Sequence, residues 1–246
     1  MQTLNYRFQE PQGAALQAGQ VSPEPHSPST QGLGPQKILN LQEGSVVFRV
    51  GEIPQGLYFL KSGAIKLVTE RKLNRGRVSS PEFINKIVAP GEFFGFKAAV
   101  LEMNYPFYAE VLTSAEVWVY SLESIKEIMN GPDSLMKAVL QQIAADLEAH
   151  EQTAQLHYLA SVQERIAYQL ALLAEKFGER VEGGLSLNLH LTRNELAQLA
   201  GTINESLSRH LTELKNEGLI DLRGKEIIVK NLPALKDKSG NFASSH

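Results

Sequence analysis

Side chains that can hydrogen-bond to the edges of nucleic-acid bases lie close together at residues 205–209. Glu205, Ser208 and Arg209 stand at positions i, i+3 and i+4, so in a helix they project from one face. An arginine can donate two hydrogen bonds to guanine, and a carboxylate can accept one from cytosine. The same spacing is that of an ordinary solvated ion pair between Glu205 and Arg209, which is the alternative interpretation.

The surrounding sequence predicts two short helices joined by a tight turn. Each helix begins with a capping-box pattern, a threonine followed three residues later by a glutamate: Thr192 with Glu195, and Thr202 with Glu205. Gly201, between the two helices, permits the positive φ of a tight turn. The second helix, Ile203–Glu217, would bury one apolar face made by Leu207, Leu211 and Leu214.

Two short apolar runs follow the second helix and predict a hairpin. Leu219–Leu222 and Glu226–Val229 flank the basic turn Arg223–Lys225. Two helices, a turn and a hairpin in this order are typical of a winged helix-turn-helix, whose second helix places its N-terminal residues in the major groove of DNA. We therefore predict DNA contacts from Arg193, Thr202, Asn204, Glu205, Ser208, Arg209 and Lys225.

A different pattern, of short strands and frequent turns, occupies residues 37–132. Strands are predicted at Ser45–Val50, Phe83–Val88 and Tyr108–Leu122. Gly56–Thr69 predicts two more strands, joined in a hairpin at Lys61–Gly63. Several such strands imply a small β-roll or barrel, which we assign as a sensor domain. Together with the helices that follow, this makes the fold class α+β.

A long helix within residues 133–161 connects the two parts. Its inward residues recur at alternating spacings of four and three, which is the seam of a two-helix coiled coil. The residues of this predicted dimerisation seam are Met136, Leu140, Ile143, Leu147, His150, Ala154, His157 and Ser161. The alternative is a helix that packs only on its own domain, but the length of the seam favours a dimer.

The remaining segments complete the predicted domain organisation. Residues 1–36 end in a stretch rich in Pro, Ser, Gly and Gln with almost no large apolar side chains, so we expect a disordered tail. Residues 162–236, which begin with a helix at Val162–Phe177, would form the DNA-binding domain. Residues 237–246 would be a second tail.

Composition and motifs exclude several classes of protein. Without cysteine the chain cannot form disulfides, thiolate zinc sites or cysteine-ligated iron–sulfur clusters. It has no phosphate-binding glycine loop, His-Glu-x-x-His helix or nucleophile elbow, so we do not expect an enzyme. The net charge of −3 does not indicate nucleic-acid binding by the chain as a whole. The positive charge of a small DNA-reading domain would, however, be masked by the acidic rest of the chain. Since no secretory signal or membrane span is visible, we expect a cytoplasmic protein without a membrane partner.

Four segments of the sequence resemble the Crp–Fnr family of bacterial transcription regulators. They are GLYFLKSGAIKL, APGEFFG, SVQERIAYQLALLAEKFG and LTRNELAQLAGTINESLSRHLTELKNEGLI. The resemblance covers roughly residues 37–235. It implies a homodimer with an N-terminal β-roll like a cyclic-nucleotide-binding domain, a long dimerisation helix and a C-terminal winged helix. It also implies double-stranded DNA and RNA polymerase as partners.

Within this family, the pattern Glu-x-x-Ser-Arg in the recognition helix is that of the Fnr-like branch. Glu205, Ser208 and Arg209 match it, whereas Asn204 stands where the cyclic-AMP receptor branch has a basic residue. The resemblance therefore implies half-sites closer to TTGAT than to TGTGA, in an inverted repeat about one helical turn apart.

The expected effector pocket departs from the family pattern. Phe96 and Lys97 stand where a cyclic-nucleotide cassette has its glutamate, and Tyr105-Pro106-Phe107 replaces Arg-Ser-Ala. A cyclic phosphate would lack its bidentate arginine, so we do not expect activation by cyclic AMP. On the long helix, His150-Glu151 replaces the Thr-Ser pair that reads adenine. The predicted effector-binding residues are Phe96, Lys97, Tyr105, Phe107, His150 and Glu151.

The identity of the effector stays open at this point. Haem is one candidate, with His150 as an axial ligand; alternatively, His150 and His157 are polar seam residues that tune dimer packing or sense pH. Another nucleotide, a cyclic dinucleotide or no ligand would fit as well. We expect a sequence-specific transcription regulator under the control of a small-molecule effector or signal. The alternative is a ligand-binding or protein-interaction module without sequence-specific DNA binding.

Overall fold

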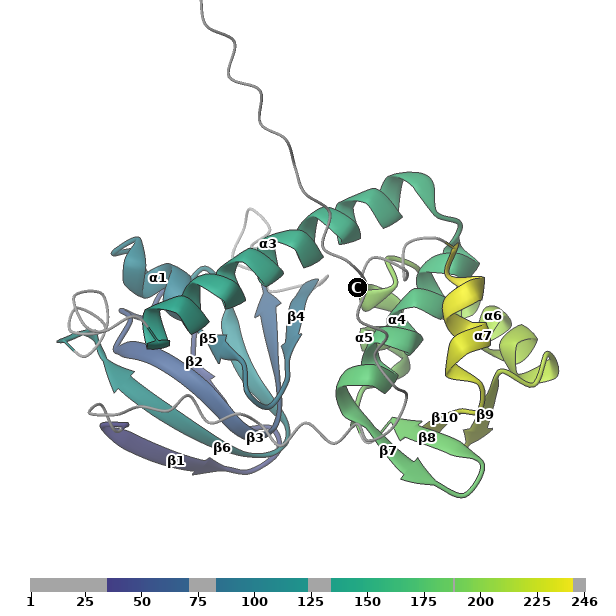
Figure 1. The fold of residues 1–246 in the computed structure, drawn as a ribbon, viewed down its shortest axis with the longest axis horizontal. Helices are drawn as coiled ribbons and strands as arrows, with labels where there is room; N and C mark the ends of the chain where they lie inside the picture. Colours follow the sequence, from purple (N-terminus) through teal and green to yellow (C-terminus); the bar gives the residue numbers. More distant parts are fainter. Residues whose placement is uncertain (1–34, 71–82, 124–133, 188, 241–246) are drawn as a thin grey trace, which may run out of the picture.

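The computed structural model describes residues 35–70, 83–123, 134–187 and 189–240 of the chain. An N-terminal β-roll and a C-terminal winged helix are joined by one long helix (Figure 1). The fold class is therefore α+β, as predicted. The predicted N-terminal tail lies outside the described residues except for Pro35 and Gln36, and the Gln36 amide already donates a hydrogen bond to the carbonyl of Val119.

The β-roll is an antiparallel sheet in the order β1-β6-β3-β4, with β2 paired to β6 and β5 paired to β3. Its strands are β1 (Lys37–Leu41), β2 (Val46–Phe48), β3 (Gly56–Thr69), β4 (Phe83–Val88), β5 (Phe93–Phe94) and β6 (Tyr108–Ser121). A short helix, α1 (Phe96–Val100), follows β5. Because side chains alternate along a strand, Tyr58 and Phe94 join one core cluster, whereas Phe59 and Phe93 join another that packs against the long helix.

The predicted hairpin at Lys61–Gly63 is wrong. Strand β3 continues through these residues and stays paired with β6, with several register shifts between Leu60 and Ile65. Gly63 has a φ of 89°, and a Cβ there would lie 2.5 Å from the carbonyl oxygen of Ser114. The residues that look like a turn therefore form a bulge that bends one long strand against its neighbour.

The long helix α3 (Ser134–Leu159) lies over the β-roll and reaches across to the winged helix (Figure 1). Val139 and Ile143 pack against the β-roll cluster that contains Phe59 and Phe93. Two other seam leucines are largely exposed in the single chain, Leu140 at 56% and Leu147 at 60%. Ala154 is exposed as well, and the side chain of Met136 falls outside the described part. Neither α3 nor any other helix among the described residues is long and apolar enough to cross a membrane.

The predicted seam is wrong at its C-terminal end. Helix α3 ends at Leu159, and Ser161 instead caps the next helix, α4 (Val162–Phe177), in a capping box with Glu164. The ring of His157 lies against Gly201, where an added Cβ would overlap its Cε1 atom. His157 therefore packs on the turn of the helix-turn-helix, which the spacing along α3 could not indicate.

The C-terminal lobe is a winged helix built on a second antiparallel sheet, in the order β7-β8-β10-β9. Its strands are β7 (Gly178–Val181), β8 (Gly184–Leu187), β9 (Ile220–Arg223) and β10 (Glu226–Val229). The helices besides α4 are α5 (Arg193–Leu199), α6 (Asn204–Asn216) and α7 (Leu232–Lys238). The helix-turn-helix is thus α5 and α6, and the wing is the hairpin β9–β10.

Two details at the ends of these helices differ from the prediction. The capping box of Thr192 and Glu195 is present, but α6 is capped by Ile203 without a side-chain hydrogen bond, so Thr202 is not its cap. Thr202 lies one residue earlier, in the turn, where its amide donates to the carbonyl of Ala197. The predicted tail from residue 237 also fails at its start, because α7 extends to Lys238 and Ser239 is fully buried.

Candidate DNA-reading surface and effector cavity

Helix α6 has one buried and one exposed face. Leu207, Leu211 and Leu214 are buried in the core that α6 shares with α4 and α5. The exposed face carries four of the predicted DNA contacts: Asn204, Glu205, Ser208 and Arg209. Although both residues are described, no ion pair joins the Glu205 carboxylate to the Arg209 guanidinium. The arrangement leaves both side chains available for a ligand, in contrast to the solvated ion pair considered above.

Two of the predicted DNA contacts are basic side chains that line the same hollow, beside α5 and the wing. Lys225 is exposed at the hairpin tip, and Arg193 is half-buried at the start of α5. Both line a hollow of about 1030 Å³, whose other walls include Leu187 and Leu191. Burial lowers the pKa of Arg193 from its ordinary value, although a guanidinium stays charged at neutral pH. Thr202, the remaining predicted contact, is half-buried in the turn before α6.

The junction between α3 and α4 is fixed by Arg165, a residue that the sequence analysis missed. Its guanidinium donates hydrogen bonds at 3.0 Å to the carbonyl oxygens of Ala160, Ala200 and Gly201. The first of these carbonyls ends the long helix, and the other two belong to the turn before α6. Burial and the nearby Arg165 charge lower the pKa of His157, the α3 residue that packs on this turn. One side chain therefore ties the end of α3 to the helix-turn-helix.

A second contact joins the β-roll directly to the helix-turn-helix. The Lys66 ammonium on β3 donates to the Glu195 carboxylate on α5 at 2.6 Å and lies 3.0 Å from that of Glu110 on β6. The side chains of Lys66 and Glu195 are only 10% and 16% exposed. One hydrophobic cluster spans the same interface and includes Ile84 of β4 and Leu196 of α5. The winged helix is therefore docked on the β-roll in this structure.

The protonation of this pair follows from its partners. Burial opposes the charge of Lys66, but the hydrogen bonds to Glu195 and Glu110 outweigh it and raise the pKa of Lys66. Burial also opposes the charge of Glu195, but hydrogen bonds from Lys66 and Thr192 lower the pKa of Glu195. Both groups are thus charged at neutral pH, and the glutamate that caps α5 also holds the β-roll.

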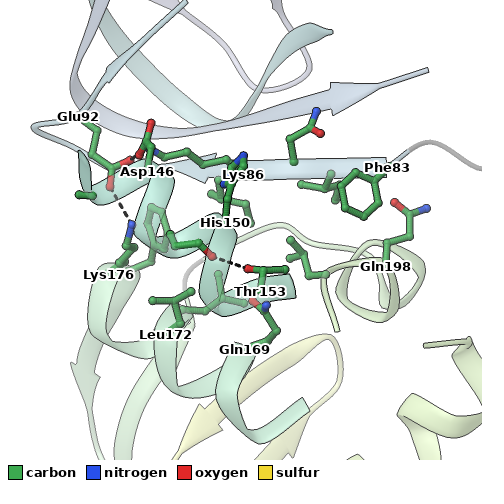
Figure 2. Close-up of a pocket in the computed structure, with 18 of the residues that line it drawn as sticks. Phe83, Lys86, Glu92, Asp146, His150, Thr153, Gln169, Leu172, Lys176 and Gln198 are labelled. Atoms are coloured by element: carbon green, nitrogen blue, oxygen red, sulfur yellow. Dashed lines mark hydrogen bonds and ion pairs between the residues drawn. The ribbon is translucent and has the colours of Figure 1, made fainter. Parts of the chain in front are cut away.

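A second set of charged side chains links β4, α3 and α4 (Figure 2). The Lys86 ammonium lies 2.5 Å from the Asp146 carboxylate of α3 and 3.0 Å from that of Glu92. Glu92 in turn accepts from Lys176 of α4 at 2.8 Å. Burial works against the charge of Glu92, but the two lysines prevail and lower its pKa. These groups line a small cavity of about 160 Å³ that also touches Gln198 and Leu199 of α5.

A larger cavity, of about 550 Å³, lies between the β-roll and α3. Four of the predicted effector-binding residues line it: Phe96, Lys97, Phe107 and His150. Tyr105 does not, because its ring turns into the core and stacks on Phe48 with centroids 3.8 Å apart. Glu151 is exposed on α3 and lies outside the cavity wall, since the next residue along a helix points in another direction. The structure therefore does not bring these two predicted effector contacts to the wall of this cavity.

Local sequence patterns could not have identified the residues that join the lobes. Lys66 and Glu195 are 129 residues apart, and Lys86 and Asp146 are 60 apart. The available signal was a lysine inside the apolar run Ala64–Val68 of β3, since a lysine is almost never buried unless it is paired. That signal predicts that Lys66 has a partner, but it does not indicate which residue the partner is.

Comparisons with known proteins agree with this geometry. Residues 38–131 match the family model of the cyclic nucleotide-binding domain, and residues 164–238 match that of the Crp-like helix-turn-helix domain. The chain is 24% identical to the "Anaerobic regulatory protein" of Haemophilus influenzae over 200 residues, which is 81% of this chain and 75% of that protein. It is 23% identical to the "Fumarate and nitrate reduction regulatory protein" of Escherichia coli K12, over 82% of this chain and 78% of that protein.

Solved structures show the same fold. A transcriptional regulator of the CRP/FNR family from Thermus thermophilus superposes with a TM-score of 0.69 at 22% identity, covering 82% of this chain and 98% of that chain. The β-roll, long helix and winged helix thus form a known architecture in which both lobes have counterparts.

Proposed function

This chain belongs to the Crp–Fnr family of DNA-binding transcription regulators, and we propose that it reads a palindromic, TTGAT-like site as a homodimer under the control of an effector. The observation that carries the proposal is the exposed face of α6. There Glu205, Ser208 and Arg209 stand free on a helix whose opposite face is anchored in the core. The partners proposed are double-stranded DNA, a second copy and RNA polymerase, in the cytoplasm and without catalysis.

The proposed readout uses each side chain of α6 according to its donors and acceptors. Arg209 donates to the O6 and N7 atoms of a guanine, and Glu205 accepts from the N4 amine of a cytosine, each contact worth about 1–3 kcal/mol of discrimination. Ser208 and Asn204 contact a base or a phosphate. Lys225 on the wing neutralises a phosphate and contributes affinity without specificity.

The proposed dimer forms through α3. Leu140, Leu147 and Ala154 recur along the helix with the spacing of a coiled-coil seam, and all three are exposed in the single chain. Ile143 packs inward on the β-roll instead, so it contributes to the seam only at its edge. Two copies related by a twofold axis would bury these side chains and present two α6 helices to one palindrome.

Control by an effector follows from the docked winged helix. The lobes meet through the Lys66–Glu195 pair and the shared core, while the short junction at Ala160–Ser161 connects α3 to α4. Only one orientation of the winged helices can place both α6 helices in successive major grooves. An effector in the cavity changes DNA affinity if it binds one orientation better than the other.

A binding selection from a pool of randomised duplexes tests the proposed site. We expect the selected sequences to converge on an inverted repeat of TTGAT-like half-sites. Convergence on TGTGA-type repeats would contradict the proposed readout. No convergence, with binding that weakens steeply as salt rises, would instead favour the ligand-binding or protein-interaction module without sequence-specific recognition.

A further inference from the structure

The walls of the 550 Å³ cavity are mainly apolar and aromatic. Its apolar lining includes Leu67, Phe93, Phe94, Leu101, Phe107 and Ile143. Such side chains come from β3, β5, α3 and the segments on either side of α1, so the cavity exists only in the folded chain. A volume of this size is in the range of sites for small organic molecules. Apolar residues outnumber the polar ones of the lining, which are Thr69, Asn85, Lys86, Lys97, Asp146 and His150, so most of the wall favours a ligand with an apolar body.

The charges around the cavity leave one cation unmatched. Its lining contains two lysines, Lys86 and Lys97, and one aspartate, Asp146. Lys86 is already paired with Asp146. Lys97, at the solvent side of α1, takes part in no ion pair with the residues that the structure describes. The site therefore has one positive charge to offer an incoming group.

We propose that the effector cavity binds an organic acid with an apolar or aromatic body, whose single carboxylate pairs with Lys97. The apolar body lies against Phe93, Phe107 and Ile143, and the carboxylate remains at the solvent side where Lys97 reaches it. This inference rests on the proposed function, because it names the chemical class of the effector. It gives the site a ligand that matches both its walls and its charge.

A cyclic nucleotide matches the same site poorly. Its ribose hydroxyls and phosphate need several buried hydrogen-bond partners, and each one left unpaired costs binding free energy. The segment 96–97, Phe-Lys, supplies no acceptor for a ribose hydroxyl through its side chains. Lys97 offers one ammonium in place of the bidentate guanidinium that suits a phosphate.

The position of the cavity gives such an acid a route to the DNA-binding lobe. Asn85, Lys86, Asp146 and His150 line both this cavity and the smaller one that touches α5. Lys86 also shares Glu92 with Lys176 of α4. An acid held at Lys97 therefore fills a cavity whose Lys86 wall belongs to the charged contacts that hold α4, which is how ligand binding changes the docking of the winged helix.

Calorimetry of the full-length protein with a matched pair of probes tests the proposal. The acid is phenylbutyrate, and the neutral control of the same shape is phenylbutanol. We expect the acid to bind at least tenfold more tightly than the alcohol, because one charge-assisted hydrogen bond is gained. In Lys97→Gln we expect the affinity for the acid to fall about tenfold while the affinity for the alcohol stays the same.

Two further variants separate the charge from the packing. Leu101→Glu places a carboxylate on an exposed residue of the cavity wall. It is expected to weaken binding of the acid more than binding of the alcohol, without placing a charge in the hydrophobic core. Lys230→Gln removes an exposed lysine that follows β10 and lies outside the proposed DNA contacts, and it should change neither affinity. Equal affinity for the acid and the alcohol, or an unchanged acid affinity in Lys97→Gln, would overturn the proposal.

Other outcomes identify other ligands. Tighter binding of cyclic AMP than of phenylbutyrate would contradict the proposal, as would a Soret band on haem titration that disappears in His150→Ala. None of these measurements contains DNA. If the acid fails to bind while the protein still selects TTGAT-like palindromes, only the ligand class is wrong, and if the selection fails, the proposed function itself is wrong.

Discussion

The DNA-reading surface and the effector cavity are built in opposite ways. The surface takes its base-reading side chains from a single stretch, Asn204–Arg209, at the start of one helix. The cavity takes its lining from residues between Leu67 and His150, which belong to different strands and helices. A site whose residues are neighbours in the sequence can be recognised from the sequence pattern. A site whose residues come from distant segments can be recognised only in the folded chain. The variants below act on one side of this contrast at a time.

The largest effect is expected from the seam that brings two DNA-reading surfaces together. Leu140→Glu combined with Ala154→Glu puts two carboxylates into the proposed seam and should give a monomer. DNA affinity should then fall by at least about a hundredfold, because the second half-site no longer binds as part of the same complex. Analytical ultracentrifugation and fluorescence anisotropy measure the two effects. Glu148→Gln, on the exposed face of the same helix, is the control; a double variant that stays dimeric would contradict the seam.

The contact between the lobes should give the next largest effect. Lys66→Met leaves the carboxylates of Glu195 and Glu110 without their shared cation, and removing one partner of a buried pair costs about 3 kcal/mol of unfolding free energy. Urea unfolding measures this loss. Lys176→Gln removes a lysine that is 36% exposed and should cost less than about 1 kcal/mol. Equal losses in the two variants would show that the lobes are not joined mainly through Lys66.

A smaller effect should separate base reading from phosphate binding. Arg209→Ala is expected to weaken binding to the specific site by about 1–3 kcal/mol and to remove discrimination at the guanine that it reads. Lys225→Gln should slightly weaken binding to every DNA sequence. It should also lower the number of counterions released on binding, measured from the salt dependence of the affinity, by about one. Anisotropy titrations at several salt concentrations distinguish the two patterns. Acid binding in the cavity should be unchanged in both variants.

Much of the winged helix could be predicted because its signals are local. Thr192 and Glu195 form the capping box as the spacing predicts, and α6 buries the three leucines expected from their helical period. The hairpin assigned at Lys61–Gly63 failed because serine and glycine also occur in bulges, and only pairing with β6 tells the two apart. The β-roll shows that turn residues identify a bend in the chain but not whether the strand ends.

The rest of the site depends on contacts that no local pattern contains. Tyr105 was assigned to the effector pocket from its place in a motif, but its ring stacks on that of Phe48 in the core. His157 has the spacing of a seam residue, yet Gly201 leaves room for it at the turn of the helix-turn-helix. In both cases the partner that decides the position is distant in sequence.

The smallest effect is a pH dependence of the contact between the lobes. Because the folded pKa of Glu195 is lowered, its contribution to stability is present above the ordinary value of 4.5 and is lost as the pH falls through the folded pKa. Because the folded pKa of Lys66 is raised, its contribution to stability is fully present below the ordinary value of 10.5 and is lost only as the pH rises above it. The stability difference between wild type and Glu195→Gln should therefore be constant near neutral pH and shrink in acid. A difference that is independent of pH down to acid would contradict the charged pair.

The most direct test of the central claim is a competition titration of the wild-type protein on two labelled palindromes that differ only in their half-sites. With Glu205, Ser208 and Arg209 reading the groove, we expect the TTGAT-type palindrome to bind at least about tenfold more tightly than the TGTGA-type palindrome at the same salt concentration. We expect Arg209→Ala to remove that preference. Equal affinities in the wild type, or a preference for TGTGA, would contradict the account.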